Sequence, residues 1–285
     1  MKRRQVAGRS RRSRIAAKMH LGRALEIPDP IFPWQSGQGR AWHAAPDIET
    51  PRMEIRPIGI VRSCFGGKFG VPRQPGLCPS AWGELMFEPE FRQAEALRGI
   101  EGFSHLWLIF GFHLTAGAGW SPTVRPPRLG GNERVGVFAS RSTFRPNGLG
   151  LSLVRLDGLE KREGQGTVLL LGGIDLVDGT PVFDIKPYLP YAEAPAGARG
   201  GFAPEEPERL EVVTAEAAGF DLLPERSRRV IAEALSLDPR PAAGREEEGR
   251  VHGAGLCGLE VKFRVEGRKC RLLSAEPAAG SALKA

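Results

Sequence analysis

Apolar and polar residues alternate over short stretches of this chain, and a period of two is typical of β-strands. The clearest stretch is "FSHLWLIFGFH" at residues 103–113. Its first face is entirely apolar: Leu106, Leu108, Phe110 and Phe112. Its second face carries His105, Trp107, Ile109 and His113. The apolar face predicts a central strand with that face in the core. The second face suggests a pocket, but for the two histidines taken alone the favoured interpretation is that both are hydrogen-bonded core residues.

The remaining pattern predicts a chain built mainly of strands. Further strands are expected at residues 55–63, 83–88, 134–142, 149–160 and within 166–190, with a hairpin at 259–276. Apolar residues at positions 91, 94, 97 and 100 predict an amphipathic helix over 89–100 that begins at a proline. A second helix is expected over 223–239, where "LDPRPA" ends it.

These elements divide the chain into three parts. Residues 1–52 are basic and carry little periodicity, so we expect little order there. That segment suits a basic arm on RNA, a transit-like segment or an over-extended translation start. Residues 53–195 form a block of strands, and residues 205–277 form a smaller α+β domain after a linker. The predicted fold class is therefore mainly β.

Charge is distributed unevenly along the chain. The net charge is +7, but residues 1–50 hold ten Lys/Arg against four Asp/Glu, and residues 51–150 hold twelve against seven. Residues 151–285 hold eighteen against twenty-two. A basic first half favours a polyanionic partner, most simply a nucleic acid, although frequent arginine can also reflect a GC-rich coding sequence.

This sequence lacks the motifs that are typical of several protein classes. Cysteines stand at 64, 78, 257 and 270 without CxxC spacing, which disfavours zinc and indicates reduced thiols of a cytosolic protein. No run approaches the roughly 18–20 apolar residues of a membrane span. No GxGxxG follows a predicted strand, and no Walker A, HExxH or GxSxG motif occurs, so a nucleotide-like cofactor would need a non-Rossmann architecture.

Unusual polar residues concentrate in segments that join or follow strands. These segments are "VPRQPG" (71–76), "ASRSTFRPNGLG" (139–150), "LVDGTP" (176–181) and "DIKPYLP" (184–190). On one curved sheet such loops can gather at one end, supported by the rigid strands. Arg73, Arg141 and Arg145 offer forked donors for a carboxylate or phosphate. Surface ion pairs and ordinary turns would explain each segment singly.

Together these segments resemble the TrmO (TsaA-like) family. The resemblance rests, in order, on "IGIVRS", "KFGVPRQPGL", "FSHLWLIFGFH", "RPPRLGG", "GVFASRSTFRPNGLGLSLV", "LVDGTPVFDIKPYLPY" and "DPRP". It implies an S-adenosylmethionine-dependent tRNA methyltransferase acting on N6 of threonylcarbamoyladenosine, beside the anticodon of threonine tRNA. It also implies a single-sheeted β-barrel with a smaller C-terminal domain, a homodimer in the cytoplasm, and no metal or membrane.

The resemblance further implies where S-adenosylmethionine binds. The matching positions are Pro72, Arg73, Gln74, His113, Leu114, Arg141, Leu151, Asp178, Gly179, Thr180 and Pro181. Leu114 and Leu151 can sandwich an adenine, and Arg141 or Arg73 can pair with the methionine carboxylate. Asp178 can meet the ribose or the ammonium group, and glycine at 179 allows close backbone approach.

Substrate and catalytic roles are our own inference from residue chemistry. The substrate-binding candidates are Arg125, Arg128, Phe144, Arg145 and Asn147, for stacking and for phosphate or carboxylate binding. Asp184 is the first candidate for a general base and His113 the second. Lys186 and Tyr188 are candidates for stabilising charge on the ureido oxygen. The alternative function is a non-catalytic RNA- or small-ligand-binding barrel that keeps the pocket.

Overall fold

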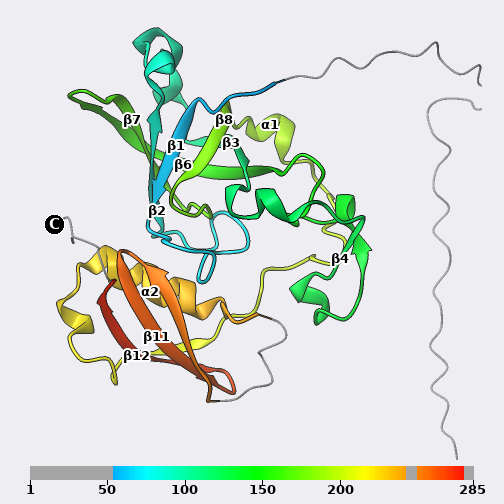
Figure 1. The fold of residues 1–285 in the computed structure, drawn as a ribbon, viewed down its shortest axis with the longest axis vertical. Helices are drawn as coiled ribbons and strands as arrows, with labels where there is room; N and C mark the ends of the chain where they lie inside the picture. Colours follow the sequence, from blue (N-terminus) through cyan, green and yellow to red (C-terminus); the bar gives the residue numbers. More distant parts are fainter. Residues whose placement is uncertain (1–53, 242–248, 279–285) are drawn as a thin grey trace, which may run out of the picture. The chain divides into compact units, whose positions relative to one another are not determined.

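The computed structural model describes residues 54–241 and 249–278. Its larger sheet is a closed barrel with the strand order β1-β2-β7-β6-β3-β8, and every neighbouring pair is antiparallel (Figure 1). Its strands are β1 (Gly59–Ser63), β2 (Trp82–Phe87), β3 (His105–Gly111), β6 (Leu149–Arg162), β7 (Gly166–Gly172) and β8 (Thr180–Pro187). The predicted mainly-β fold with a single-sheeted barrel is confirmed.

The barrel closes because each strand turns its apolar face inward. On β3, Leu106 and Leu108 are fully buried, whereas His105, Trp107 and Ile109 between them are only half-buried. The same alternation occurs on the other strands, and the interior is filled by Val61, Leu85, Val154, Leu169, Leu171 and Val182. The apolar face predicted for residues 103–113 is therefore the face that fills the barrel.

The amphipathic helix predicted over residues 89–100 is wrong. The segment forms three separate 3₁₀ turns: Pro89–Phe91, Ala94–Leu97 and Ile100–Gly102. Gln93 has an extended backbone between the first two turns, and Gly99 adopts a left-handed conformation with φ of 86°, so a continuous helix cannot form. Phe91, Leu97 and Ile100 still pack against the core, which explains their helix-like spacing.

The strand predicted over residues 134–142 is also wrong for most of its length. Only β5 (Val135–Gly136) is paired, with β4 (Thr123–Val124), and a 3₁₀ turn follows at Val137–Ala139. The amide of Val137 donates to the carbonyl of Pro122, and the chain then turns through Ser140. The residues after Val137 therefore do not continue as a strand.

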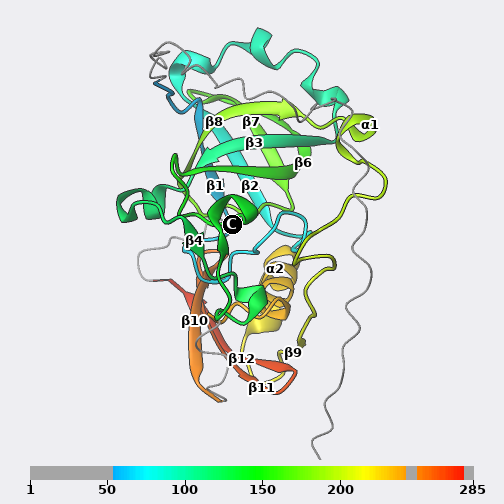
Figure 2. The same ribbon diagram turned by 90° about the vertical axis from the view of Figure 1, so that its right-hand side faces the viewer.

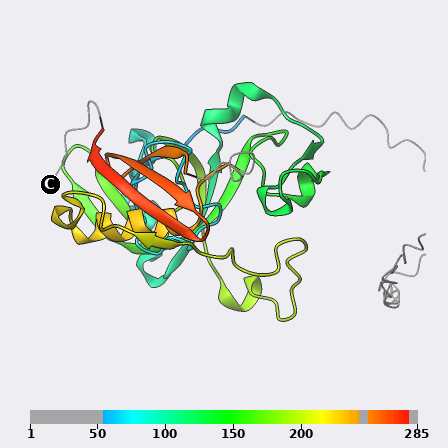
Figure 3. The same ribbon diagram turned by 90° about the horizontal axis from the view of Figure 1, so that it is seen from below.

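The C-terminal residues form a second sheet with the order β10-β11-β12-β9, packed against one helix (Figure 3). Its elements are β9 (Glu211–Val213), α2 (Glu225–Ser236), β10 (Val251–Leu256), β11 (Leu259–Glu266) and β12 (Lys269–Pro277). The predicted hairpin over 259–276 is confirmed as β11 and β12. The predicted helix is confirmed but ends at Ser236. A short helix, α1 (Pro190–Glu193), follows the barrel.

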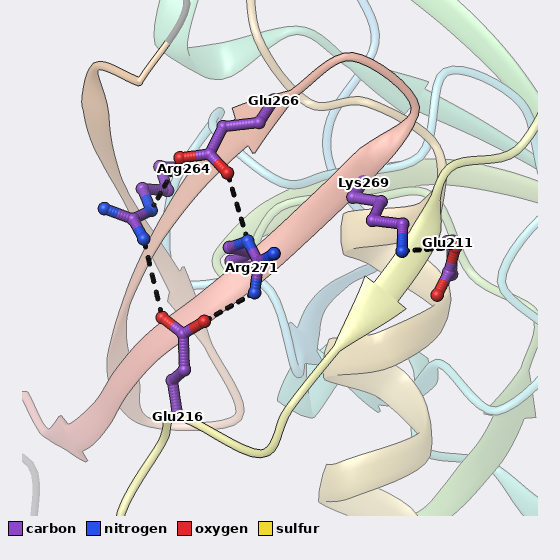
Figure 4. A network of polar contacts seen from close by, with 6 residues as sticks. All are labelled: Glu211, Glu216, Arg264, Glu266, Lys269 and Arg271. Atoms are coloured by element: carbon purple, nitrogen blue, oxygen red, sulfur yellow. Dashed lines mark hydrogen bonds and ion pairs between the residues drawn. The ribbon is translucent and has the colours of Figure 1, made fainter.

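A network of ion pairs covers part of this second sheet (Figure 4). Glu216 contacts Arg271 at 2.6 Å and Arg264 at 3.7 Å, and Glu266 contacts the same two arginines. Lys269 pairs separately with Glu211 at 3.6 Å. These side chains are 30–63% exposed, so water screens each pair and each contributes little to the stability of the sheet.

Within the described residues there is no disulfide and no group of side chains suited to a metal ion. Three of the four thiols are buried, and burial raises the pKa of Cys270 to about 12. None of the helices in the described part of the chain is long and apolar enough to cross a membrane.

Close packing inside the barrel generates a stability prediction. A Cβ atom added at Gly150 would lie 2.3 Å from the ring of Phe110, whereas one added at Gly158 on the same strand would meet nothing closer than 3.9 Å. Gly150→Ala should lower the free energy of unfolding by about 1–3 kcal/mol because the ring must shift. Chemical denaturation should show no comparable loss for Gly158→Ala; equal losses would contradict this packing.

Candidate active site

Three connections meet at one end of the barrel. Residues 64–81 link β1 to β2, residues 112–148 link β3 to β6, and residues 173–179 link β7 to β8. In an antiparallel barrel these connections must lie at the same end, and Figures 1 and 2 show them together there. Most of the predicted cofactor residues lie in these connections. Leu151, Thr180 and Pro181 lie at the first residues of β6 and β8.

Direct contacts tie these connections to one another. The Nη1 atom of Arg141 donates to Oε1 of Gln74 at 2.5 Å, which joins the second connection to the first. The Nζ atom of Lys68 donates to the carbonyl of Leu114 at 2.9 Å and joins the same two connections. Two residues of the predicted cofactor set, 67 positions apart in sequence, are therefore in contact.

Asp178 holds the third connection against β1. Its carboxylate accepts from the amide of Ser63 at 3.0 Å and from Nη1 of Arg62 at 3.1 Å. Gly179 follows with φ of 81°, and its amide donates to the carbonyl of Val61 at 2.8 Å. The hydroxyl of Thr180 donates to the carbonyl of Val177 at 2.6 Å. The side chains of Asp178 and Thr180 thus fix the shape of this turn. The turn requires a left-handed conformation at residue 179, which glycine adopts readily.

The outer face of the barrel carries the next part of the candidate site. The strand register sets Leu151, Ile109 and Asp184 side by side on β6, β3 and β8. Leu151 is 53% exposed, and Leu114, in the neighbouring connection, is 47% exposed. Two strand spacings separate Leu151 from Asp184, a distance of roughly 10 Å. An exposed apolar surface thus lies near a carboxylate.

The three catalytic candidates do not lie together. Asp184 pairs with Lys186 at 3.0 Å, and both side chains are exposed. The amide of Tyr188 donates to the carbonyl of His105 at the opposite end of β3. Tyr188 is thus roughly 25 Å along the strand from Thr180. Within one chain, Asp184 lies in the same row as Leu151, Lys186 pairs with Asp184 two residues further along β8, and Tyr188 lies at the opposite end of β3.

The two histidines of residues 103–113 also lie apart. His105, at the start of β3, contacts the hydroxyl of Ser104 at 3.0 Å and the ring of Tyr188 edge-on. His113 follows the end of the strand and begins a 3₁₀-helix, His113–Ala118. The two imidazoles therefore do not face one pocket within a chain, because the strand separates them by its full length. His113 alone lies at the candidate site.

The predicted substrate residues lie in the connection 112–148, but several already have partners. Nη1 of Arg145 donates to the carbonyls of Ser140 and Ser142 and so holds its own loop. Arg128 donates to the carbonyl of Glu205. Arg125, Phe144 and Asn147 are exposed, and Arg128 is exposed as well despite its bond to Glu205.

Sequence reasoning missed two exposed aromatic residues in this connection. Phe138 is 77% exposed and Trp120 is 56% exposed. Backbone bonds from Val137 to Pro122 and from Ser121 to Phe144 hold their segments side by side. For Trp120 the available signal was an aromatic residue in a loop rich in glycine and proline, where no strand face would bury it. Phe138 gave no such signal, because it lay within the strand predicted over 134–142.

A half-buried carboxyl group under the site was also missed. The hydroxyl of Ser152, which is fully buried on β6, donates to Asp175 at 2.5 Å. Burial raises the pKa of Asp175 to about 6, although the bond from Ser152 and the charge of Arg141 oppose this shift. The signal was the polar Ser152 at an inward position of the alternating stretch "LGLSLV".

Asp175 makes stability depend on pH. Its pKa is raised in the folded state, so its contribution is complete below the unfolded pKa near 3.8 and is lost as pH rises through about 6. Relative to Asp175→Asn, the wild-type unfolding free energy should fall by on the order of 2 kcal/mol between pH 4 and about 7. Denaturant titrations across this range measure the difference. If the unfolding free energies of the wild type and of Asp175→Asn change equally with pH, the pKa of Asp175 is not raised in the folded state.

Comparison with known proteins identifies the family. The model of the tRNA-methyltransferase O N-terminal domain matches residues 60–194, and that of the TrmO C-terminal domain matches residues 207–278. An Escherichia coli protein named tRNA (adenine(37)-N6)-methyltransferase is 46% identical over 232 residues, covering 79% of this chain and 98% of that protein. A Pseudomonas aeruginosa protein named as an S-adenosylmethionine-dependent methyltransferase, RcsF, is 49% identical over 215 residues, covering 73% and 91%.

Solved structures agree with the sequence comparison. The crystal structure of TrmO from Pseudomonas aeruginosa superimposes with a TM-score of 0.64 at 41% identity, and the match covers 80% of this chain and 99% of that one. Both domain models are matched, and the similarity extends along nearly the whole Escherichia coli relative. The chain therefore belongs to the tRNA-methyltransferase O family.

Proposed function

We propose that this protein transfers a methyl group from S-adenosylmethionine to N6 of threonylcarbamoyladenosine at position 37 of threonine tRNA. The observation that carries the proposal is the contact between Arg141 and Gln74, which brings distant cofactor candidates together at one barrel end. Family membership supports the same reaction class, since the Escherichia coli relative is named for methylation of adenine 37. It also supports a homodimer acting in the cytoplasm, as the family resemblance implies.

The residues at this end of the barrel fit the proposed cofactor. Leu114 and Leu151 expose about half of their surface, which is unusual for leucine and suits an adenine ring. Arg73 and Arg141 provide positive charge for a carboxylate. The left-handed turn at Gly179 leaves no Cβ to block close approach of a ligand to the backbone. When bound, S-adenosylmethionine supplies an electrophilic methyl group.

The chain's own part in the reaction is positioning and proton transfer. N6 of threonylcarbamoyladenosine is attached to a carbonyl, so its lone pair is a weak nucleophile until the proton is removed. We assign proton removal to Asp184, because its row on the outer face also contains Leu151. To Lys186, which pairs with Asp184, we assign stabilisation of negative charge on the ureido oxygen. Tyr188 has no part in this scheme because of its distance within one chain.

The connection 112–148 is suited to hold the anticodon loop. It contains five arginines and a single glutamate, a net charge of +4. Phe138, Trp120 and Phe144 are exposed on it, and unpaired bases stack on aromatic rings of this kind. Arg125 can meet the phosphates, while Arg145 maintains the loop that presents Phe144.

Arg141 provides the test of the cofactor site. Arg141→Ala should abolish S-adenosylmethionine binding in calorimetry, because both the charge and the link to Gln74 are lost. The matched control is Arg56→Ala, since Arg56 is an equally exposed arginine that pairs with Glu90 away from the three connections. A wild-type dissociation constant in Arg141→Ala would refute the proposed site.

The substrate is tested with defined tRNA. The full chain should methylate threonine tRNA that carries threonylcarbamoyladenosine and should leave the same transcript without that modification unmethylated. Mass spectrometry of the released nucleosides measures the product. Equal methylation of both transcripts would contradict the proposed substrate, and tight cofactor binding without turnover on either would favour a non-catalytic barrel.

A further inference from the structure

The loop that carries Arg73 and Gln74 is held largely by the C-terminal residues. We call residues 72–81 the anchored loop; it lies between β1 and β2, beside α2 (Figures 1 and 2). Both carboxylate oxygens of Glu233 on α2 accept from Ser80. The Ser80 hydroxyl donates at 2.7 Å and its amide at 2.9 Å. Hydrogen bonds to a carboxylate are among the strongest that a neutral donor can make.

Further contacts follow the anchored loop along its length. Nη2 of Arg209 donates to the carbonyl of Leu77 at 2.8 Å. Nη2 of Arg73 itself donates to the carbonyl of Arg240 at 3.4 Å. On the barrel side, the amide of Gly76 donates to the carbonyl of Gly173 at 2.8 Å. The C-terminal residues thus hold the anchored loop at its start, middle and end.

The partner of Arg73 lies in a rigid turn. Arg240 is 6% exposed, and its guanidinium binds both carboxylate oxygens of Asp238 at 2.8 and 3.1 Å. Asp238 has φ of 49°, an uncommon conformation for a residue other than glycine, which Asp tolerates better than most. This turn is the "DPRP" segment, which in the sequence indicated the end of a helix and was one of the motifs of the family resemblance.

We propose that Glu233 is a positioning residue for the cofactor site and that it acts through Ser80 and the anchored loop. The proposal rests on the proposed function, in which Arg73 and Gln74 bind S-adenosylmethionine. Gln74 contacts Arg141, so a shift of the anchored loop displaces both sides of the site. The C-terminal domain thereby acquires a role: it preorganises one wall of a site that lies on the barrel.

A preorganising role has a distinctive kinetic signature. If the anchored loop is released, binding of S-adenosylmethionine must also order the loop, which weakens affinity in the ground state and the transition state alike. The KM for S-adenosylmethionine in Glu233→Gln should therefore rise about ten- to a hundredfold, with kcat at saturation changed less than about twofold. A catalytic role for Glu233 would instead lower kcat.

The experiment compares full-length variants by calorimetry with S-adenosylmethionine and by steady-state methylation of tRNA. Glu233→Gln and Ser80→Ala should each weaken cofactor binding, and the double variant should be little worse than Glu233→Gln, because the two residues act as one unit. Glu216→Ala is the matched control. It removes a carboxylate of the same domain that pairs with Arg264 and Arg271 in the network of Figure 4, and it should bind the cofactor normally.

The outcomes separate this proposal from the function on which it rests. Wild-type affinity in Glu233→Gln overturns the positioning role, and the proposed site survives if Arg141→Ala still abolishes binding. Wild-type affinity in both variants overturns the site as well. Additive effects of Ser80→Ala and Glu233→Gln, or an equal loss of affinity in Glu216→Ala, would show general destabilisation and would also overturn the positioning role.

Discussion

Backbone hydrogen bonding between β8 and β1 turns six antiparallel strands into a closed barrel, and the candidate site depends on that closure. Pairing of Val182 with Gly59 and of Thr180 with Val61 brings the last strand beside the first. An open sheet would spread its connections along an edge, whereas the barrel brings alternate connections together at one end. At that end Arg141 of one connection contacts Gln74 of another.

The C-terminal domain adds a second constraint at the same end of the barrel. A barrel strand ends in a fixed position, but a connection of eighteen residues such as 64–81 has many conformations to lose. Glu233, Arg209 and the buried turn at Arg240 restrict those conformations from outside the barrel. Rigid strands on one side and a docked helix on the other therefore define the region that carries Arg73.

The sequence predicted the strands well where one face was uniformly apolar. Residues 103–113 were recognisable because the alternation of Leu106 and Leu108 reports the barrel interior directly. The helix predicted over residues 89–100 was wrong because Phe91, Leu97 and Ile100 pack against the core from separate turns. Apolar spacing alone cannot detect the left-handed conformation of Gly99, which precedes Ile100. Contacts such as Ser80 with Glu233 join distant positions, and no local pattern encodes them.

The candidate site was only partly accessible to sequence reasoning. The cofactor candidates came from resemblance to a family, and the roles of Asp178 and Arg145 in holding turns became visible only with their partners in place. Asp175 became notable once its burial beside Ser152 was seen. The positions of Tyr188 and His105 depended on strand direction, which fixes the end of the barrel at which a residue lies.

The central claim is that S-adenosylmethionine binds where the connections 64–81, 112–148 and 173–179 meet. Hydrogen–deuterium exchange of the full chain with and without the cofactor tests it most directly. We expect slower exchange in all three connections together, and unchanged exchange in residues 89–102 and 188–193 at the opposite end. Protection confined to that opposite end, or to only one of the three connections, would contradict the claim.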